Sequence, residues 1–303
     1  MSPIPMAQPA PSALAPSHGT QLAALRHPLR HLRRLAGDRL ALVGLLVLIP
    51  VVLLVLVGPA LDRYGPDAID DMAMLQAPTG AHWLGTDDLG RDMLSRLMVG
   101  GRLSLSVGLG SVLLALVSGV PLGLLSGYLG GLVDEILMRL IDSLMALPAL
   151  VLALTITAVL GPGLLNAMLA IAVVAMPTFT RLVRGQVMAI KHREYVDAAV
   201  AVGVRPLRVV LRHILPNVAS PVIVQGSLGV GFAIITESSV SFIGLGAQPP
   251  TATWGSMVQV GFQYLETAPW FALAPACMIF LVVLAFTMLG EGLRTALDPA
   301  THA

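Results

Sequence analysis

Residues 194–217 read EYVDAAVAVGVRPLRVVLRHILPN, a charged segment that separates two long apolar stretches of the chain. Glu194 to Val202 is compatible with a short helix, and Gly203 stands where a left-handed C-terminal cap is expected. Pro206 suits the first position of a second helix, where its missing N–H costs nothing. We therefore expect two helices joined by a tight turn, with Pro216 ending the second one.

The second of these helices is expected to have one apolar and one basic face. Its apolar residues recur at the spacing of a single helical face, and its arginines fall on the other face. The apolar positions are Leu207, Val210, Leu211, Ile214 and Leu215, and the basic ones are Arg205, Arg208 and Arg212. Such a helix-turn-helix at a membrane surface is shaped to dock against another protein.

The composition on both sides of this segment is that of a membrane protein. Hydrophobic residues make up 56% of the 303 residues and charged residues only 12%, and the mean hydropathy is +0.83. Several uncharged runs are long enough to cross a hydrocarbon layer of about 30 Å as helices. The glycines around Pro162 divide the longest run at a turn. We predict six spans: 40–61, 103–128, 137–160, 164–184, 217–239 and 271–290.

The distribution of Lys and Arg predicts the orientation of these spans. With the N-terminus inside, fourteen of the 18 basic residues fall in cytoplasmic segments and four in outer segments. Both termini and residues 194–217 are then cytoplasmic. The three tryptophans, Trp83, Trp254 and Trp270, fall on the outer side, where interfacial anchors are expected.

Residues 197–216 resemble a known family, the membrane-spanning subunits of bacterial ABC importers. Their signature is E-A-A, three residues, G, nine residues and I-x-L-P. This chain has Asp197, Ala198, Ala199, Gly203, Leu215 and Pro216 at that spacing. Asp197 replaces the usual glutamate, and His213 replaces isoleucine. The resulting R-H-I-L-P-N form is similar to that of the dipeptide, oligopeptide and nickel permease branch.

Three further segments carry the same resemblance: His82 to Leu97, Ser241 to Gly255 and Glu291 to Pro299. The resemblance implies an all-α membrane protein of six transmembrane helices with the type I, MetI-like permease architecture. The expected organisation is a cytoplasmic tail (1–38), a first transmembrane helix (39–62), a periplasmic segment (63–101), a permease core (102–291) with a coupling loop (185–216), and a cytoplasmic tail (292–303).

The chain lacks the motifs with which it would hydrolyse ATP. A P-loop needs Gly-Lys-Ser/Thr, and the one lysine, Lys191, follows Ile190. No nucleophile elbow and no H-E-x-x-H motif occurs either. We expect a non-catalytic subunit without cofactors, with ATP and Mg²⁺ bound by partner subunits. A gradient-driven transporter is the rival class, but it generally needs ionisable groups at membrane depth, and the spans contain few.

The resemblance implies both the partners and the residues that contact them. The expected complex in the inner membrane pairs this chain with a related permease, two ATP-binding subunits and a periplasmic or lipid-anchored binding protein. The coupling residues are Glu194, Tyr195, Asp197, Ala198, Ala199, Gly203, Arg205, Leu215 and Pro216. The implied substrate is a di- or oligopeptide, with glutathione or a nickel chelate as alternatives.

A few charged residues near the span ends have two interpretations each. Glu237 either lines the pathway or reaches water at the membrane boundary. Arg139 and Asp142, three residues apart, are expected to form a local ion pair. Asp87, Asp88 and Asp92 suggest a metal site, but Thr86 or Asp87 as a helix cap explains them without a metal.

Overall fold

The computed structural model describes residues 38–297, and helices make up most of this part of the chain. Five long helices are apolar enough to cross a membrane: α3 (Arg39–Leu61), α4 (Met93–Leu129), α7 (Leu164–Ile190), α10 (Leu215–Phe242) and α12 (Pro269–Leu297). The predicted all-helical membrane fold is confirmed. The predicted N-terminal tail up to residue 37 and the last residues of the C-terminal tail, 298–303, lie outside the described residues.

The third predicted span, 137–160, is wrong as a single helix. The chain forms α5 (Gly131–Met145) and α6 (Ala149–Leu160), which meet at an angle of 90°. Pro148 explains the break, because it lacks an N–H and disfavours helical backbone at the residue before it. After α6, Gly161 and Gly163 adopt positive φ angles of 91° and 150° and form the predicted turn into α7.

Helix α4 begins ten residues before the predicted span. Arg96 and Arg102 interrupt the uncharged run, so hydropathy alone places the start too late. The predicted helix cap at Thr86 or Asp87 is also wrong. The helix starts at Met93, and the carboxylate of Asp92 caps it by accepting a 2.8 Å hydrogen bond from the backbone N–H of Ser95.

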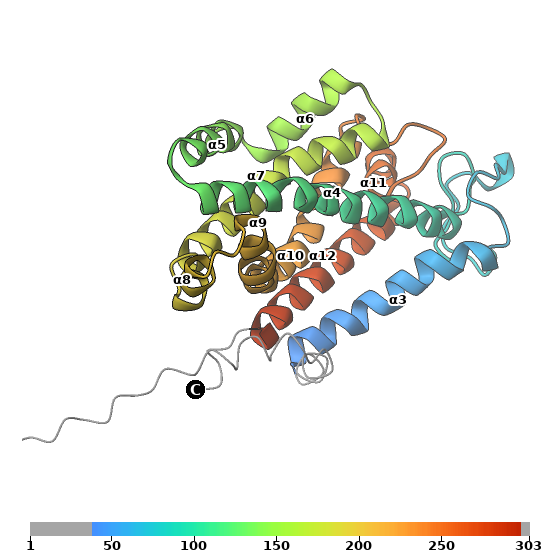
Figure 1. The fold of residues 1–303 in the computed structure, drawn as a ribbon. Coiled ribbons are helices and arrows are strands. Elements are labelled where there is room, and N and C mark those ends of the chain that lie inside the picture. The colour runs from blue at the N-terminus through green and yellow to red at the C-terminus, as the bar shows by residue number, and fades with distance from the viewer. Residues whose placement is uncertain (1–37, 298–303) are drawn as a thin grey trace, which may run out of the picture.

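Helices α4 and α7 pack side by side through small residues (Figure 1). A Cβ atom added to Gly119, Gly123 or Gly127 would lie 2.8, 2.6 or 3.0 Å from a carbonyl oxygen of α7. These oxygens belong to Met176, Thr180 and Arg184, one helical turn apart. The glycine repeat therefore lets the two backbones touch, as its i, i+4 spacing predicts.

The remaining helices close around this pair. Helix α10 contacts α4, α7 and α12, and α3 lies against α12 and α4 (Figure 1). The short helix α11 (Trp254–Phe262) packs on α12 and α10. Trp254 is fully buried and donates from Nε1 to the carbonyl oxygen of Leu97 at 3.0 Å. The prediction that it anchors at the membrane interface is wrong, because the glycine at position 101 admits its ring to the core.

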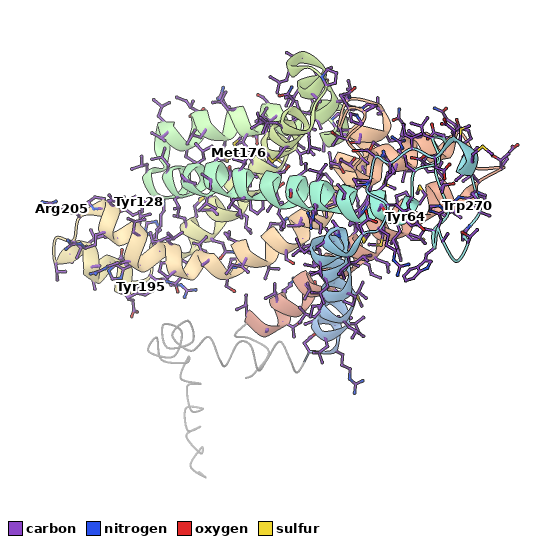
Figure 2. All side chains as sticks on the ribbon, turned by 90° about the vertical axis from the view of Figure 1, so that its right-hand side faces the viewer. Tyr64, Tyr128, Met176, Tyr195, Arg205 and Trp270 are labelled. Carbon is purple, nitrogen blue, oxygen red and sulfur yellow. The ribbon has the colours of Figure 1, made fainter. Side chains whose placement is uncertain are left out.

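The long helices give the molecule two distinct ends (Figure 2). One end carries Tyr128, Tyr195 and Arg205, and the other carries Tyr64 and Trp270. At the first end lie α8 (Glu194–Ala201), α9 (Pro206–Val209) and the π-helical turn η2 (Val210–Ile214). We call these elements and the turn between them the elbow. The opposite end carries residues 62–92, here called the lobe, which includes the 3₁₀ turn η1 (Asp71–Ala73).

Candidate functional site

The elbow turns at Gly203 as the sequence predicts. Helix α8 ends at Ala201, and Gly203 has a φ angle of +80°. Its N–H donates to the carbonyl of Val200 at 2.9 Å, and the next N–H, of Val204, donates to Ala199 at 3.1 Å. This pair of bonds is a Schellman cap, which needs a left-handed residue at the position of the glycine.

Beyond the turn, the predicted stop at Pro216 is wrong. Pro206 does begin α9, but the helix continues through η2 into α10 and ends only at Phe242. In η2 the N–H of Leu215 donates to the carbonyl of Val210, five residues back. This wider turn makes room for the Pro216 ring and tolerates its missing N–H. The elbow is therefore joined directly to a long membrane helix.

The π turn also changes which side chains are buried. Val209 and Ile214 are fully buried and pack with Val187, Val196 and Val218. The predicted apolar stripe is only partly correct, because Leu207 and Leu211 are 70% and 51% exposed. Val200 and Val202 on the other side of the turn are exposed as well. Four large apolar side chains thus point outward from the elbow, beside the exposed Arg205, Arg208 and Arg212.

The other predicted coupling residues lie on or beside this surface. Glu194, Asp197 and Ala198 are exposed on α8, Ala199 is buried, and Leu215 and Pro216 are half-buried where η2 meets α10. Tyr195 is half-buried, and its hydroxyl accepts a 3.3 Å hydrogen bond from the side-chain amide of Asn217. Burial raises the pKa of the Tyr195 hydroxyl. Tyr195 therefore ties the first helix of the elbow to the start of α10.

Glu237 lies far from the elbow and does not reach water. Its side chain is fully buried in α10 and accepts hydrogen bonds from Ser241 at 2.8 Å and from Ser104 of α4 at 3.4 Å. The Ser104 oxygen in turn accepts from the backbone N–H of Trp254 at 3.1 Å. The structure thus excludes the water-exposed alternative. Glu237 joins α4, α10 and α11 in one polar cluster.

Two of the three aspartates that suggested a metal site, Asp87 and Asp92, have close structural partners. The buried carboxylate of Asp87 accepts backbone hydrogen bonds from Leu89 and Arg91 at 2.9 Å each. It also pairs with the side chains of Arg91 at 2.6 Å and Arg96 at 3.3 Å. Asp92 pairs with His82 at 2.9 Å. Within the described residues, no group of three His, Cys, Asp or Glu side chains is arranged to hold a metal ion.

The predicted ion pair between Arg139 and Asp142 is wrong. Arg139 pairs with Glu135 at 2.6 Å on the same helix, and Asp142 pairs with Arg181 of α7. A spacing of three residues permits a contact, but the neighbouring helix α7 supplies a nearer guanidinium. Asp134 pairs in the same way with Arg184 of α7 at 2.5 Å. These two pairs fasten α5 across α7.

Comparison with known proteins gives the class of this molecule. Residues 119–302 match the family described as binding-protein-dependent transport system inner membrane component. Residues 29–78 match the N-terminal TM domain of oligopeptide transport permease C. The architecture is also similar to that of the MetNI methionine ABC transporter, with a TM-score of 0.54 at 20% identity over 67% of this chain and 97% of that one. The helices and the elbow therefore belong to an importer permease.

Individual relatives extend this likeness over nearly the whole chain. The dipeptide transport system permease protein DppC of Alkalihalophilus pseudofirmus is 41% identical over 97% of this chain and 96% of its own. The di/tripeptide transport system permease protein DppC of Pseudomonas aeruginosa is 42% identical over 87% and 89%. The glutathione transport system permease protein GsiD of Escherichia coli is 40% identical over 88% of each. The chain belongs to the family of binding-protein-dependent inner membrane components and is a multi-pass permease subunit of an ABC importer.

Proposed function

We propose that this chain forms half of a translocation pathway for di- and oligopeptides, and that the elbow couples the pathway to ATPase subunits. The substrate class is supported by relatives named for dipeptides, for di- and tripeptides and for glutathione, itself a tripeptide. A glutathione importer of the same architecture is therefore the second candidate. Both candidates use the same elbow and the same helices.

The exposed apolar surface of the elbow carries the coupling proposal. Val200, Val202, Leu207 and Leu211 are exposed, and no other part of the described chain covers them. The elbow that carries them lies at one end of the molecule (Figure 2). Contiguous apolar groups with a charged rim are typical of protein interfaces. Because α9 continues through η2 into α10, a partner that moves the elbow also moves a membrane helix.

The orientation belongs to the same proposal. Most Lys and Arg residues lie at the elbow end and in the tails, which favours a cytoplasmic elbow and cytoplasmic N- and C-termini. The lobe and α11 then face the periplasm, where a substrate-binding protein would dock. ATPase subunits in the cytoplasm would reach the elbow without entering the membrane.

The proposed partners rest on the likeness to binding-protein-dependent ABC importers. The working complex contains this chain, a related second permease, two ATP-binding subunits and a binding protein. The ATP-binding subunits hold ATP and Mg²⁺, and this chain is a non-catalytic subunit that binds no cofactor. ATP-driven closure of the two ATPases favours one arrangement of the elbows over the other, and the membrane helices follow by that difference in binding free energy.

Polar substitutions on the elbow test the coupling. We expect Leu207→Asp and Leu211→Asp to remove the ATPase subunits from the purified complex and to abolish ATP-dependent uptake of trialanine into proteoliposomes. The control for ATPase binding is Ile69→Asp, which changes a comparably exposed residue at the opposite end of the molecule and should leave the ATPase subunits in the complex. Retention of the ATPases and wild-type uptake by both elbow variants would refute the coupling role. Vanadate-insensitive uptake by this chain alone would favour a gradient-driven transporter instead.

A further inference from the structure

A cavity of about 600 Å³ lies at the break between α5 and α6, against α7 and α10. Pro177 of α7 lines it, and the adjacent Met176 lies about midway between the elbow end and the lobe end (Figure 2). The lining residues from the break itself are Leu144, Met145, Leu147, Pro148, Ala149 and Leu152. In secondary transporters, broken helices near the middle of the membrane commonly form the substrate site, because their irregular backbone must face a cavity.

The lining of this cavity contains two polar side chains, Gln225 of α10 and Thr178 of α7, and no charged one. Neither side chain makes a hydrogen bond to any residue between 38 and 297. Gln225 is half-buried and Thr178 is exposed, so both polar side chains are open to the cavity. A glutamine amide offers two donors and a carbonyl acceptor to an occupant. The cavity is thus prepared for an occupant with polar groups, which a lipid chain does not have.

Helix α10 continues the same face toward the other end of the molecule. Gln225, Gly229 and Phe232 line the cavity at helical spacing. Farther along this face, Ile235, Ser239 and Phe242 line a second cavity of about 440 Å³ between α6, α10, α11 and α12. The two cavities therefore lie along one side of α10, as a route for the solute along this helix requires.

We propose that the cavity at the α5–α6 break binds the peptide bond of the transported solute through the side-chain amide of Gln225. An amide pairs with another amide by donating to its carbonyl and accepting from its N–H. The apolar walls contact side chains without selecting them by charge. This inference rests on the proposed function, because it names the group that a peptide permease recognises, and the volume suits a small peptide.

Removal of the amide tests this role in the complete importer. We expect Gln225→Leu to lower trialanine uptake about five- to tenfold, because it deletes the hydrogen bonds to the peptide. The matched control is Gln186→Leu on α7, since Gln186 is also half-buried and free of hydrogen bonds within the described residues but does not line the cavity. Equal uptake by the two variants would overturn the proposal.

A labelling experiment gives a readout besides transport. Cys277 is the one cysteine of the chain, so Cys277→Ala provides a background for Thr178→Cys in the cavity wall. We expect a methanethiosulfonate reagent to modify this cysteine, trialanine to slow the modification at least fivefold during ATP-driven turnover, and Gln225→Leu to remove the protection.

The outcomes separate this proposal from the function on which it rests. A cysteine that is unreactive under all conditions means that a helix of the second permease fills the cavity. A reactive cysteine that trialanine does not protect means that lipid or water occupies it. Either result overturns the peptide site. If the wild-type importer takes up trialanine in an ATP-dependent manner, the proposed function stands without this peptide site. If the wild-type importer shows no such uptake, the proposed function itself is refuted.

Discussion

The Nε of Arg102 on α4 donates a 2.9 Å hydrogen bond to the backbone carbonyl of Val55 on α3. In an unbroken helix this carbonyl accepts from the residue four positions later, but that residue is Pro59, which has no N–H. The guanidinium also donates to the carbonyl of Leu56 at 2.6 Å. The arginine thus supplies the Val55 carbonyl with the donor that Pro59 lacks, near the end of a membrane helix.

Replacing Arg102 by methionine is expected to destabilise the permease by about 1–3 kcal/mol, because it leaves the Val55 carbonyl unpaired. Pro59→Ala restores a backbone N–H that can donate to the Val55 carbonyl. We therefore expect Arg102→Met to lower the stability of the permease less in the Pro59→Ala background. The measurement is unfolding of the purified permease by SDS titration, with Arg63→Met as the control at an exposed arginine that makes no hydrogen bond within the described residues. Equal costs in both backgrounds would show that Arg102 does not act through this carbonyl.

Gly203 is expected to tolerate only residues that accept a left-handed backbone. A Cβ atom there meets no neighbour within 4 Å, so the φ angle of +80° is the sole constraint. Gly203→Pro, with φ fixed near −65°, should abolish uptake while the protein still inserts in the membrane. Gly203→Asn should retain most uptake, because asparagine adopts this conformation more readily than other residues.

Uptake and membrane fractionation of these variants decide the question. Gly185→Ala on α7 is the control, because it also adds a Cβ in open space but at an ordinary helical φ angle. Wild-type uptake from Gly203→Pro would show that the elbow turn is dispensable.

The sequence predicts those features that depend on local backbone chemistry or on apolar length. The cap at Gly203, the start at Pro206 and the turn at Pro162 follow from residues adjacent in the chain. The features it misses depend on contacts between distant segments. The helix continues through Pro216 because a π turn accommodates the proline ring and its missing N–H. The periodicity of apolar residues does not predict such a turn.

The candidate site also combines features that local sequence predicts with features that depend on distant segments. The motif residues of the elbow lie where their spacing places them, but the exposure of Leu207 and Leu211 depends on the register shift in η2. Glu237 is buried because Ser104 lies opposite it on α4, 133 residues away in sequence. The importance of Gln225 arises from a cavity among four helices, and no local signal marks it.

Glu237→Gln tests whether the buried carboxyl group acts as a hydrogen-bond acceptor in packing or as a charge in transport. The amide oxygen of glutamine can still accept the hydrogen bond from Ser241, so we expect little change in the free energy of unfolding. Glu237→Leu deletes the acceptor and leaves the hydroxyl groups of Ser104 and Ser241 without this partner. We expect it to lower the free energy of unfolding by about 1–3 kcal/mol. If Glu237 serves transport as an ion, Glu237→Gln should lower uptake without lowering stability.

Both quantities are measured on the same preparations, by SDS unfolding and by trialanine uptake. A normal uptake rate for Glu237→Gln would assign the residue to packing of α4, α10 and α11 alone.

Of the three α4 glycines that face carbonyl oxygens of α7, Gly123 makes the closest approach. An added Cβ would lie 2.6 Å from the carbonyl oxygen of Thr180 and 2.7 Å from the Cβ of Val183, so the backbones must separate. We expect Gly123→Ala to destabilise the permease by about 1–3 kcal/mol, as overpacking does in other interiors. Gly185→Ala, which meets nothing within 4 Å, should instead be neutral or slightly stabilising. Unfolding of both variants by SDS titration checks the difference, and equal stability would mean that α4 and α7 do not pack through this glycine face.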